Sequence, residues 1–341
     1  MERPYILHLF TPGHQASPFD VNMAADAGYQ IITPYTDVGV DGVTALTQDA
    51  IFSRGPKGVT RTGIFIGGRD ALLAADMLER AKQAMFKPFV VSLMADPSGA
   101  YTTAAAMVAC VEAALQRHHG LALSGQTVLV LGGTGPVGRI AAVLAAQAGA
   151  RVRIASHSSL DTAKKAAHDT GARFGVELEG VSGADRAAVR SELAQAGVVL
   201  ACAAAGVQVV SSEDLAFAKT LKVAADVNAV PPEGIAGVGV MDDAKPLAGV
   251  AGAVGIGALA VGNVKYQTQH RLLVSMYQAE KAVVLSFRKR SPRRASISPS
   301  RPRPNPLLEL IAAHACAGRR GRLRAHAGRG GSARRLRRRR A

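Results

Sequence analysis

The feature that most constrains the fold is a glycine-rich turn between a strand and a helix. An apolar run, TVLVL at residues 127–131, leads into Gly133, Gly135 and Gly138, which have the G-x-G-x-x-G spacing. An alanine-rich helical pattern comes next, and a second apolar run at 150–155 completes a βαβ unit. The spacing alone is weak evidence, and a plain tight turn is the alternative. In this context it predicts a dinucleotide-binding turn in a doubly wound parallel sheet.

Each glycine of the turn has an expected role. Gly133 is expected to allow the sharp turn, Gly135 to let the backbone approach a pyrophosphate, and Gly138 to permit close packing of helix on strand. The start of the helix offers free N–H groups and a partial positive charge to phosphates. The predicted cofactor-binding turn comprises Gly133, Thr134, Gly135, Pro136, Val137 and Gly138.

The acidic residue that usually binds the ribose of NAD is missing. It is expected about 20 residues beyond the turn, where the chain has Ser156, His157, Ser158 and Ser159, and the next carboxylate is Asp161. Without that negative charge, nothing repels a ribose 2′-phosphate, and serine hydroxyls can donate to it. We therefore expect NADP to be accepted, with NAD as a second cofactor. The alternative is that these serines only cap the following helix.

Apolar runs alternate with helical patterns along both halves of the chain, which predicts an α/β fold with mostly parallel sheets. The predicted strands lie at 5–10, 29–35, 62–68, 88–96, 127–131, 150–155, 198–203 and 222–227. The predicted helices lie near 18–27, 41–52, 69–86, 99–118, 137–148, 159–169 and 185–195. We expect a substrate-side α/β domain at 1–120 and a Rossmann domain, a doubly wound parallel sheet, at 121–287.

The formal charge of +16 is concentrated in one segment. Residues 288–341 hold seventeen Arg and one Lys against one Glu, whereas residues 1–287 hold 23 basic and 24 acidic side chains. The segment offers no apolar stripe, so we expect it to be disordered. Its composition is what a shifted reading frame in GC-rich DNA produces. The alternative is a basic arm for nucleic acid, with binding that weakens steeply as salt rises.

The cysteines and the apolar segments indicate the compartment. Cys110, Cys202 and Cys316 are isolated, with no CxxC and no histidine cluster at metal spacing, which argues against disulfides and a metal site. The apolar run near the N-terminus is too short for a signal peptide. The uncharged stretch at 249–264 is too short and too rich in glycine for a membrane span. We expect a cytoplasmic protein.

Ligands of doubly wound sheets lie beyond the carboxyl ends of the strands, and this rule selects further candidates. Small residues follow the strand at 198–203, and polar residues follow the strand at 222–227. The candidates for the cofactor are Ala204, Gly206, Asp226 and Asn228, and Lys265 closes a second glycine-rich segment. In the first half, Asp96 and Ser98 follow a strand and open a helix. A cap or turn role is the alternative for each polar residue.

Motifs that are missing indicate the chemistry. The chain has no G-x-S-x-G elbow, no Walker A sequence and no His or Lys motif of the hydroxy-acid dehydrogenases. These absences favour a hydride transfer that needs no proton shuttle.

Six segments in order carry a resemblance to a known family. FDVNMAADAG, IFIGGRDALLAAD, DPSGAYTTAAA, VLGGTGPVG, DVNAVPPEGI and GAVGIGAL are similar to segments of the methylenetetrahydromethanopterin dehydrogenases of methylotrophic bacteria, over about residues 4–285. The resemblance implies an NAD(P)-dependent oxidoreductase of one-carbon metabolism. Such an enzyme oxidises the methylene bridge of the reduced pterin to a methenyl cation, in formaldehyde oxidation. The tail beyond residue 287 departs from the family.

The resemblance also implies where the pterin binds, in a cleft between a small N-terminal domain and the Rossmann domain. Asp20 is expected to accept two N–H bonds from the aminopyrimidinone edge, and Lys265 to orient the pterin through its carbonyl. The residues expected at the substrate are Asp20, Asp96, Ser98, Thr102, Thr103 and Lys265.

Other functions remain open from the sequence. The substrate is a methylenetetrahydrofolate in one alternative. A shikimate- or amino-acid-type dehydrogenase is another, and it needs a Lys/Asp pair in the first domain, for which Lys57, Lys82 and Lys87 show no partner. A nucleotide-sensing protein that uses the basic tail to bind nucleic acid is the non-enzymatic alternative, and we expect nucleic acid not to be a partner. Faces rich in alanine and glycine predict a homo-oligomer.

Overall fold

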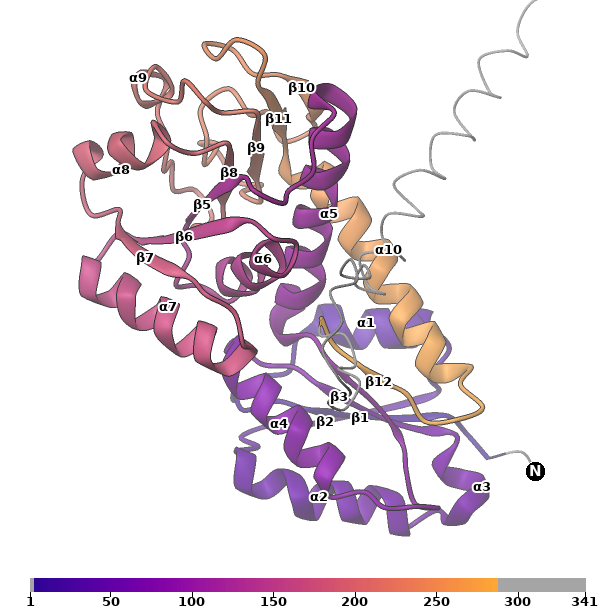
Figure 1. The fold of residues 1–341 in the computed structure, drawn as a ribbon. Helices are drawn as coiled ribbons and strands as arrows, with labels where there is room; N and C mark the ends of the chain where they lie inside the picture. The colour runs from indigo at the N-terminus through magenta and orange to yellow at the C-terminus, as the bar shows by residue number, and fades with distance from the viewer. Residues whose placement is uncertain (1–2, 288–341) are drawn as a thin grey trace, which may run out of the picture.

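The computed structural model describes residues 3–287, which form two parallel sheets with helices between and around them (Figure 1). The basic segment that was expected to be disordered lies outside the described residues. The α/β class and the two-sheet plan predicted from the sequence are confirmed.

The first sheet has five parallel strands in the order β12-β4-β3-β1-β2. Its strands are β1 (Ile6–Phe10), β2 (Ile31–Tyr35), β3 (Thr62–Ile66), β4 (Ser92–Ala95) and β12 (Val284–Leu285). The central strand β3 reads TGIFI and is buried at every position, as a strand covered on both faces must be.

The helices of the first half follow the predicted pattern. They are α1 (Pro18–Asp26), α2 (Val40–Phe52), α3 (Gly55–Val59), α4 (Ala71–Gln83), the 3-10 turn η1 (Pro97–Gly99) and α5 (Ala100–His119). The carboxylate of Asp70 caps α4 by accepting from the amides of Leu72 and Leu73. The same helix buries Met77, Leu78 and Ala81 in the core, while Leu72 and Leu73 are partly buried.

The second sheet has seven strands in the order β10-β11-β9-β8-β5-β6-β7. Its strands are β5 (Thr127–Leu131), β6 (Arg151–Ser156), β7 (Glu179–Ser182), β8 (Val198–Ala201), β9 (Val223–Asp226), β10 (Asp243–Pro246) and β11 (Val254–Ile256). Its helices are α6 (Pro136–Gln147), α7 (Leu160–Phe174), α8 (Arg186–Leu193), α9 (Ser212–Leu215) and α10 (Ala258–Tyr277). Apart from antiparallel β10, this is the strand order of a Rossmann fold.

The chain returns to the first sheet after the second is complete. The helix α10 leaves the second sheet and packs along α5 and α1, and β12 then pairs with β4 (Figure 1). The sequence placed residues 284–285 in the Rossmann domain, but they form the edge of the first sheet.

One hydrophobic core runs through both halves. It includes Leu9 and Ile66 of the first sheet together with Val130 and Ile140 of the second unit. The helix α5 lies at the centre, and its small buried side chains let α6 and α10 pack closely against it. Among the described residues, Pro97–His119 is the one helical segment long and apolar enough for a membrane span, and 72% of its apolar window is buried in this core.

Candidate active site

The glycine-rich turn joins β5 to α6 at the carboxyl edge of the second sheet. Gly132 has a φ of +74°, and a Cβ there would lie 2.6 Å from the backbone nitrogen of Ala203. The sequence assigned the sharp turn to Gly133, but Gly132 makes it. Gly133 is needed instead for packing, because a Cβ there would lie 2.6 Å from Cβ of Ile154.

The first turn of α6 has backbone amides that no side chain caps. Gly135 is the N-cap residue and has no side chain to bond the first amides, and Pro136 follows it. A Cβ on Gly138 would lie 2.5 Å from the carbonyl oxygen of Gly132, so only glycine lets the helix start so close to the turn. Arg139 secures the turn by donating to the carbonyl oxygen of Thr134 over 2.9 Å. The geometry therefore fits the phosphates of a dinucleotide.

The end of β6 carries hydroxyls and no carboxylate. The buried Ser156 accepts a 3.2 Å hydrogen bond from the amide of Ser158. Ser159 caps α7 by accepting from the amide of Thr162 over 3.1 Å, the structural role considered for these serines. The exposed His157 lies with Nε2 3.4 Å from Oγ of Ser158.

The loops after β8 and β9 are tied to each other by the two polar residues predicted at the cofactor. Asn228 accepts from the amide of Gly206 over 3.0 Å and donates to the carbonyl of Pro232 over 2.8 Å. Asp226 accepts from the amides of Asn228 and Ile235 over 2.9 and 3.1 Å. Their polar atoms hold the loops in place, and the exposed Ala204 lies in the first of these loops.

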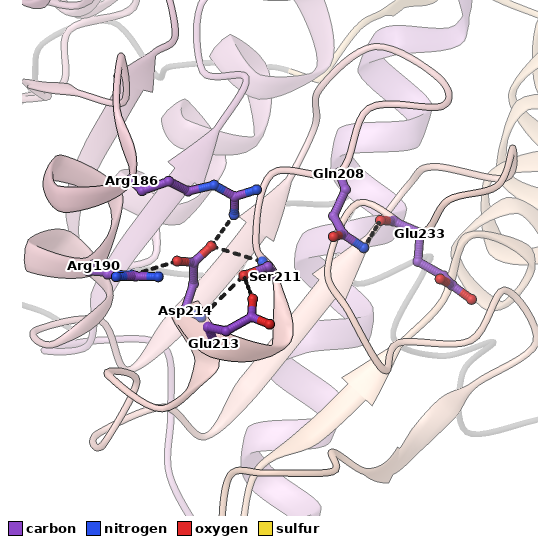
Figure 2. Close-up of polar contacts among 7 residues, drawn as sticks. All are labelled: Arg186, Arg190, Gln208, Ser211, Glu213, Asp214 and Glu233. Atoms are coloured by element: carbon purple, nitrogen blue, oxygen red, sulfur yellow. Dashed lines mark hydrogen bonds and ion pairs between the residues drawn. The ribbon is translucent and has the colours of Figure 1, made fainter.

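A polar cluster joins α9 to α8 (Figure 2). The fully buried carboxylate of Asp214 on α9 accepts from Arg186 and, over 2.7 Å, from Arg190 of α8. Burial opposes ionisation, but the bonds from Ser211, Arg190 and Arg186 outweigh it and lower the pKa of Asp214. Gln208 donates to the carbonyl of Glu233 over 3.4 Å. No local pattern in the sequence links Asp214 to Arg186 and Arg190, because they are far apart in the chain.

Asp96 follows β4 of the first sheet and is fully buried. Its carboxylate accepts from the amides of Tyr101 and Thr102 over 2.9 and 3.1 Å and from the hydroxyl of Thr102 over 2.6 Å. Asp96 and Thr102 therefore stabilise the start of α5, and Thr103 lies half-buried beside them. Ser98 donates to the carbonyl oxygen of Gly68 over 2.8 Å.

Asp20 of α1 lies beside two residues of α10, Lys265 and Gln269. Gln269 donates from Nε2 to Oδ1 of Asp20 over 3.0 Å, and both side chains are buried. The ammonium of Lys265, one turn earlier on α10, lies 3.6 Å from the centre of the Phe19 ring, which is 44% exposed. A Cβ on Gly99 would lie 3.0 Å from Nζ of Lys265, so this glycine leaves room for the lysine.

Burial sets the charge of these groups. Burial first, and then the negative charge of Asp96, raise the pKa of Asp20 to about 7, against the opposing effects of Gln269 and Lys265. Burial raises the pKa of Asp96 against its bonds to Thr102, and burial lowers the pKa of Lys265 against the two carboxylates. Within residues 3–287, no three His, Cys, Asp or Glu side chains gather as a metal site.

The fold brings together Asp20, Asp96 and Lys265, as the resemblance implied, and adds two residues that sequence reasoning missed. Phe19 was not predicted as a site residue because an aromatic residue near a predicted helix start usually belongs to the hydrophobic core. Gln269 was hidden because a lone glutamine on a helix carries no motif. The one available signal was the i, i+4 spacing of Lys265 and Gln269, which places them on one face of α10.

Comparisons with known proteins agree with this geometry. The family described as "Methylene-tetrahydromethanopterin dehydrogenase, N-terminal" matches residues 18–98. An NAD(P)-dependent methylenetetrahydromethanopterin dehydrogenase of Methylorubrum extorquens is 48% identical over 83% of this chain and 95% of its own length. The Bifunctional protein MdtA of the same organism is 34% identical over 82% of this chain and 94% of its length.

Among solved structures, a 5-ketofructose reductase of Gluconobacter sp. strain CHM43 is similar with a TM-score of 0.48 and 15% identity, over 92% of this chain and 99% of that chain. The matches to the two Methylorubrum proteins cover 83% and 82% of this chain. The chain belongs to the methylenetetrahydromethanopterin dehydrogenase family.

Proposed function

We propose that this protein transfers a hydride from methylenetetrahydromethanopterin to NAD(P)+ and so forms methenyltetrahydromethanopterin. The observation that carries the proposal is the cleft in which Asp20, Lys265 and Gln269 lie together, in a chain 48% identical to an enzyme named for this reaction. The C–H bond of the methylene bridge breaks, and its electron pair leaves with the hydrogen. The product is a cation stabilised by the two neighbouring nitrogens, so no proton has to be removed.

The glycine-rich turn and the β6 end fit NADP and NAD. The amides at the start of α6 bind the pyrophosphate, and Gly132, Gly135 and Gly138 leave room for it. Ser156, His157 and Ser158 face the ribose without a carboxylate, so a 2′-phosphate is tolerated. Asp226 and Asn228 contribute by holding the loop that contains Gly206. When bound, NAD(P)+ supplies the hydride acceptor.

The other wall binds the pterin. Asp20 accepts N–H bonds from its aminopyrimidinone edge, and Lys265 donates to its carbonyl. The exposed face of Phe19 provides a surface on which a flat ring stacks. Ser98 and Thr103 line the same wall, and Asp96 with Thr102 fixes the helix start that supports it.

Catalysis in this arrangement is mostly positioning. Holding the methylene carbon against the hydride acceptor contributes roughly 7–11 kcal/mol in favourable cases. The carboxylates of Asp20 and Asp96 favour the positive product. A full positive charge on Lys265 at the reacting carbon opposes it, so Lys265 acts at the pterin carbonyl and serves as an orienting residue.

Of the alternatives, a shikimate-type enzyme needs a lysine paired with an aspartate in the first domain. Lys82 pairs instead with Glu79, one helical turn away on the exposed side of α4. A tetrahydrofolate substrate is the alternative that remains closest to the geometry. Homo-oligomer formation and the cytoplasm stay predictions.

The test is an anaerobic assay of reduced nicotinamide formation, followed by absorbance, with methylenetetrahydromethanopterin and either NAD+ or NADP+. We expect reduction with both cofactors, and a lower rate with methylenetetrahydrofolate. Absence of reduction from folded protein with both cofactors would overturn the proposal.

A further inference from the structure

Gln269 is a fully buried polar side chain in which one of the two polar atoms has no hydrogen-bond partner among the described residues. Its Nε2 donates to Asp20, but its Oε1 is buried and has no hydrogen-bond partner among the described residues. Buried polar atoms without partners are rare and destabilising, by about 1–3 kcal/mol each. An unpaired acceptor beside the proposed pterin wall therefore indicates a partner that comes with the ligand.

The orientation of the Gln269 amide follows from Asp20. An ionised carboxylate only accepts hydrogen bonds, so the amide has to turn its N–H₂ group towards Asp20. Its carbonyl oxygen then points to the side of Gly99 and Lys265. That oxygen and Nζ of Lys265 lie 4.0 and 3.0 Å from the point where a Cβ of Gly99 would stand. Both atoms therefore lie near Gly99, at the start of α5.

We propose that Gln269 belongs to the pterin-binding edge: its N–H₂ group positions the Asp20 carboxylate, and its side-chain carbonyl accepts a further N–H of the aminopyrimidinone, beside those that Asp20 accepts. This inference rests on the proposed function. When the pterin carbonyl draws Lys265 towards it, the oxygen of Gln269 becomes accessible. The edge is then recognised by two acceptors from different helices, Asp20 of α1 and Gln269 of α10.

The surroundings of Asp20 determine how the pair responds to pH. Asp96, before α5, and Lys265, on α10, are the charged groups that change the pKa of Asp20. Gly67, which follows β3, also lies near the Asp20 carboxylate but carries no charge. The bond from Gln269 lowers the pKa of Asp20, in opposition to burial and Asp96. Loss of this bond therefore raises that pKa further. Activity that needs ionised Asp20 then requires a higher pH.

The experiment compares Gln269→Leu with wild type and with Thr268→Val as the matched control. Thr268 is the next residue of α10, is also buried, and bonds only the carbonyl of Val264 among the described residues. For Gln269→Leu we expect the KM for the pterin to rise about 10–100-fold, because a buried N–H of the pterin then lacks its acceptor. The KM for NADP+ should stay within about twofold of wild type. Thr268→Val should leave both values unchanged.

Two pH readouts complete the test. The acid limb of kcat/KM for the pterin should move to higher pH in Gln269→Leu. In the ligand-free protein, infrared titration of carboxyl groups should show one that titrates near pH 7, disappears in Asp20→Asn and moves up in Gln269→Leu. A glutamine that only holds Asp20 would move both curves, but at a pH well above the pKa of Asp20 its loss would leave the KM for the pterin unchanged.

The outcomes separate the two proposals. A wild-type protein that reduces neither cofactor with the pterin overturns the proposed function. An active wild type with an unchanged pterin KM in folded Gln269→Leu, measured well above the pKa of Asp20, overturns the role of Gln269 alone.

Discussion

The two walls that we propose for the cofactor and the pterin are built by opposite means. The cofactor wall consists of main-chain atoms. Gly132, Gly135 and Gly138 have no side chains, so main-chain amides can reach the ligand. The pterin wall consists of buried polar side chains, with Asp20 bonded to Gln269 and Lys265 beside them. The first wall excludes Cβ atoms and so recognises phosphate by shape. The second desolvates charges and so recognises a ligand by its hydrogen bonds and its charge.

The largest effect should come from filling the cofactor wall. A Cβ at position 138 lies 2.5 Å from the carbonyl oxygen of Gly132. The valine side chain of Gly138→Val therefore clashes with this oxygen and displaces the turn. We expect kcat/KM for NADP+ to fall at least about 100-fold, since overpacking costs about 1–3 kcal/mol and misplaces the amides. Steady-state kinetics and calorimetric binding of NADP+ measure this.

The control for that change is Gly175→Ala. Gly175 has a φ of +70° with no heavy atom within 4 Å of a Cβ, so the substitution strains the end of α7 without touching the turn. It should lower the stability by about 1 kcal/mol and leave NADP+ binding unchanged. Equal loss of cofactor binding in both variants would show that the turn has no special role.

The next largest effect should come from the pterin wall. Asp20→Asn removes the charge but keeps the shape, and we expect the KM for the pterin to rise about 10–100-fold with the NADP+ dissociation constant unchanged. Separate titrations of the two ligands test whether the walls act independently. A parallel loss of NADP+ affinity would contradict the comparison.

Cofactor choice should respond to one carboxylate at the end of β6. Ser156→Asp introduces the missing acid, and its side chain still accepts from the amide of Ser158. Repulsion of the 2′-phosphate should raise the KM for NADP+ about tenfold, with the KM for NAD+ within a few-fold of wild type. Equal changes for the two cofactors would mean that the ribose does not lie at Ser156.

The pH dependence should belong to the pterin wall. Because the pKa of Asp20 is raised to about 7, kcat/KM for the pterin should fall about tenfold between pH 8 and pH 6 as Asp20 gains a proton. Stability should change in the opposite direction. The raised pKa makes the folded protein bind the proton more tightly, so this contribution is present at low pH and is lost as pH rises towards 7. Urea unfolding of wild type and Asp20→Asn across this range checks the sign.

The smallest effect should come from a glycine in neither wall. Gly262 lies inside α10 with no heavy atom within 4 Å of a Cβ. Gly262→Ala should raise the free energy of unfolding by about 0.5–1 kcal/mol and leave both KM values unchanged. A changed pterin KM would mean that the α10 position responds to helix stability.

The same contrast explains what the sequence predicted. The cofactor wall is local: strand, turn and helix follow each other, so the glycine spacing and the missing acid were readable, although the positive φ belongs to Gly132 and not Gly133. The pterin wall combines residues 19–20, 96–103 and 265–269, and no local pattern links Asp20 to Gln269.

The return of the chain to the first sheet was also not predictable. The strand β12 has two residues, and α10 shows only a weak apolar stripe because its buried positions include the polar Thr268 and Gln269. Both belong to the first half of the molecule through contacts with β4, α1 and α5, which no sequence periodicity encodes. The resemblance identified Asp20 and Lys265, and the fold was needed to add Gln269 and Phe19.

Direct hydride transfer between the two walls is the central claim, and isotope labelling tests it most directly. The substrate is methylenetetrahydromethanopterin with both hydrogens of the methylene carbon replaced by deuterium. It is incubated anaerobically with NADP+, and both products are analysed by mass spectrometry. The account predicts one deuterium in NADPH and one retained on the methenyl carbon. Reduced cofactor without deuterium, or release of deuterium to water, would contradict it.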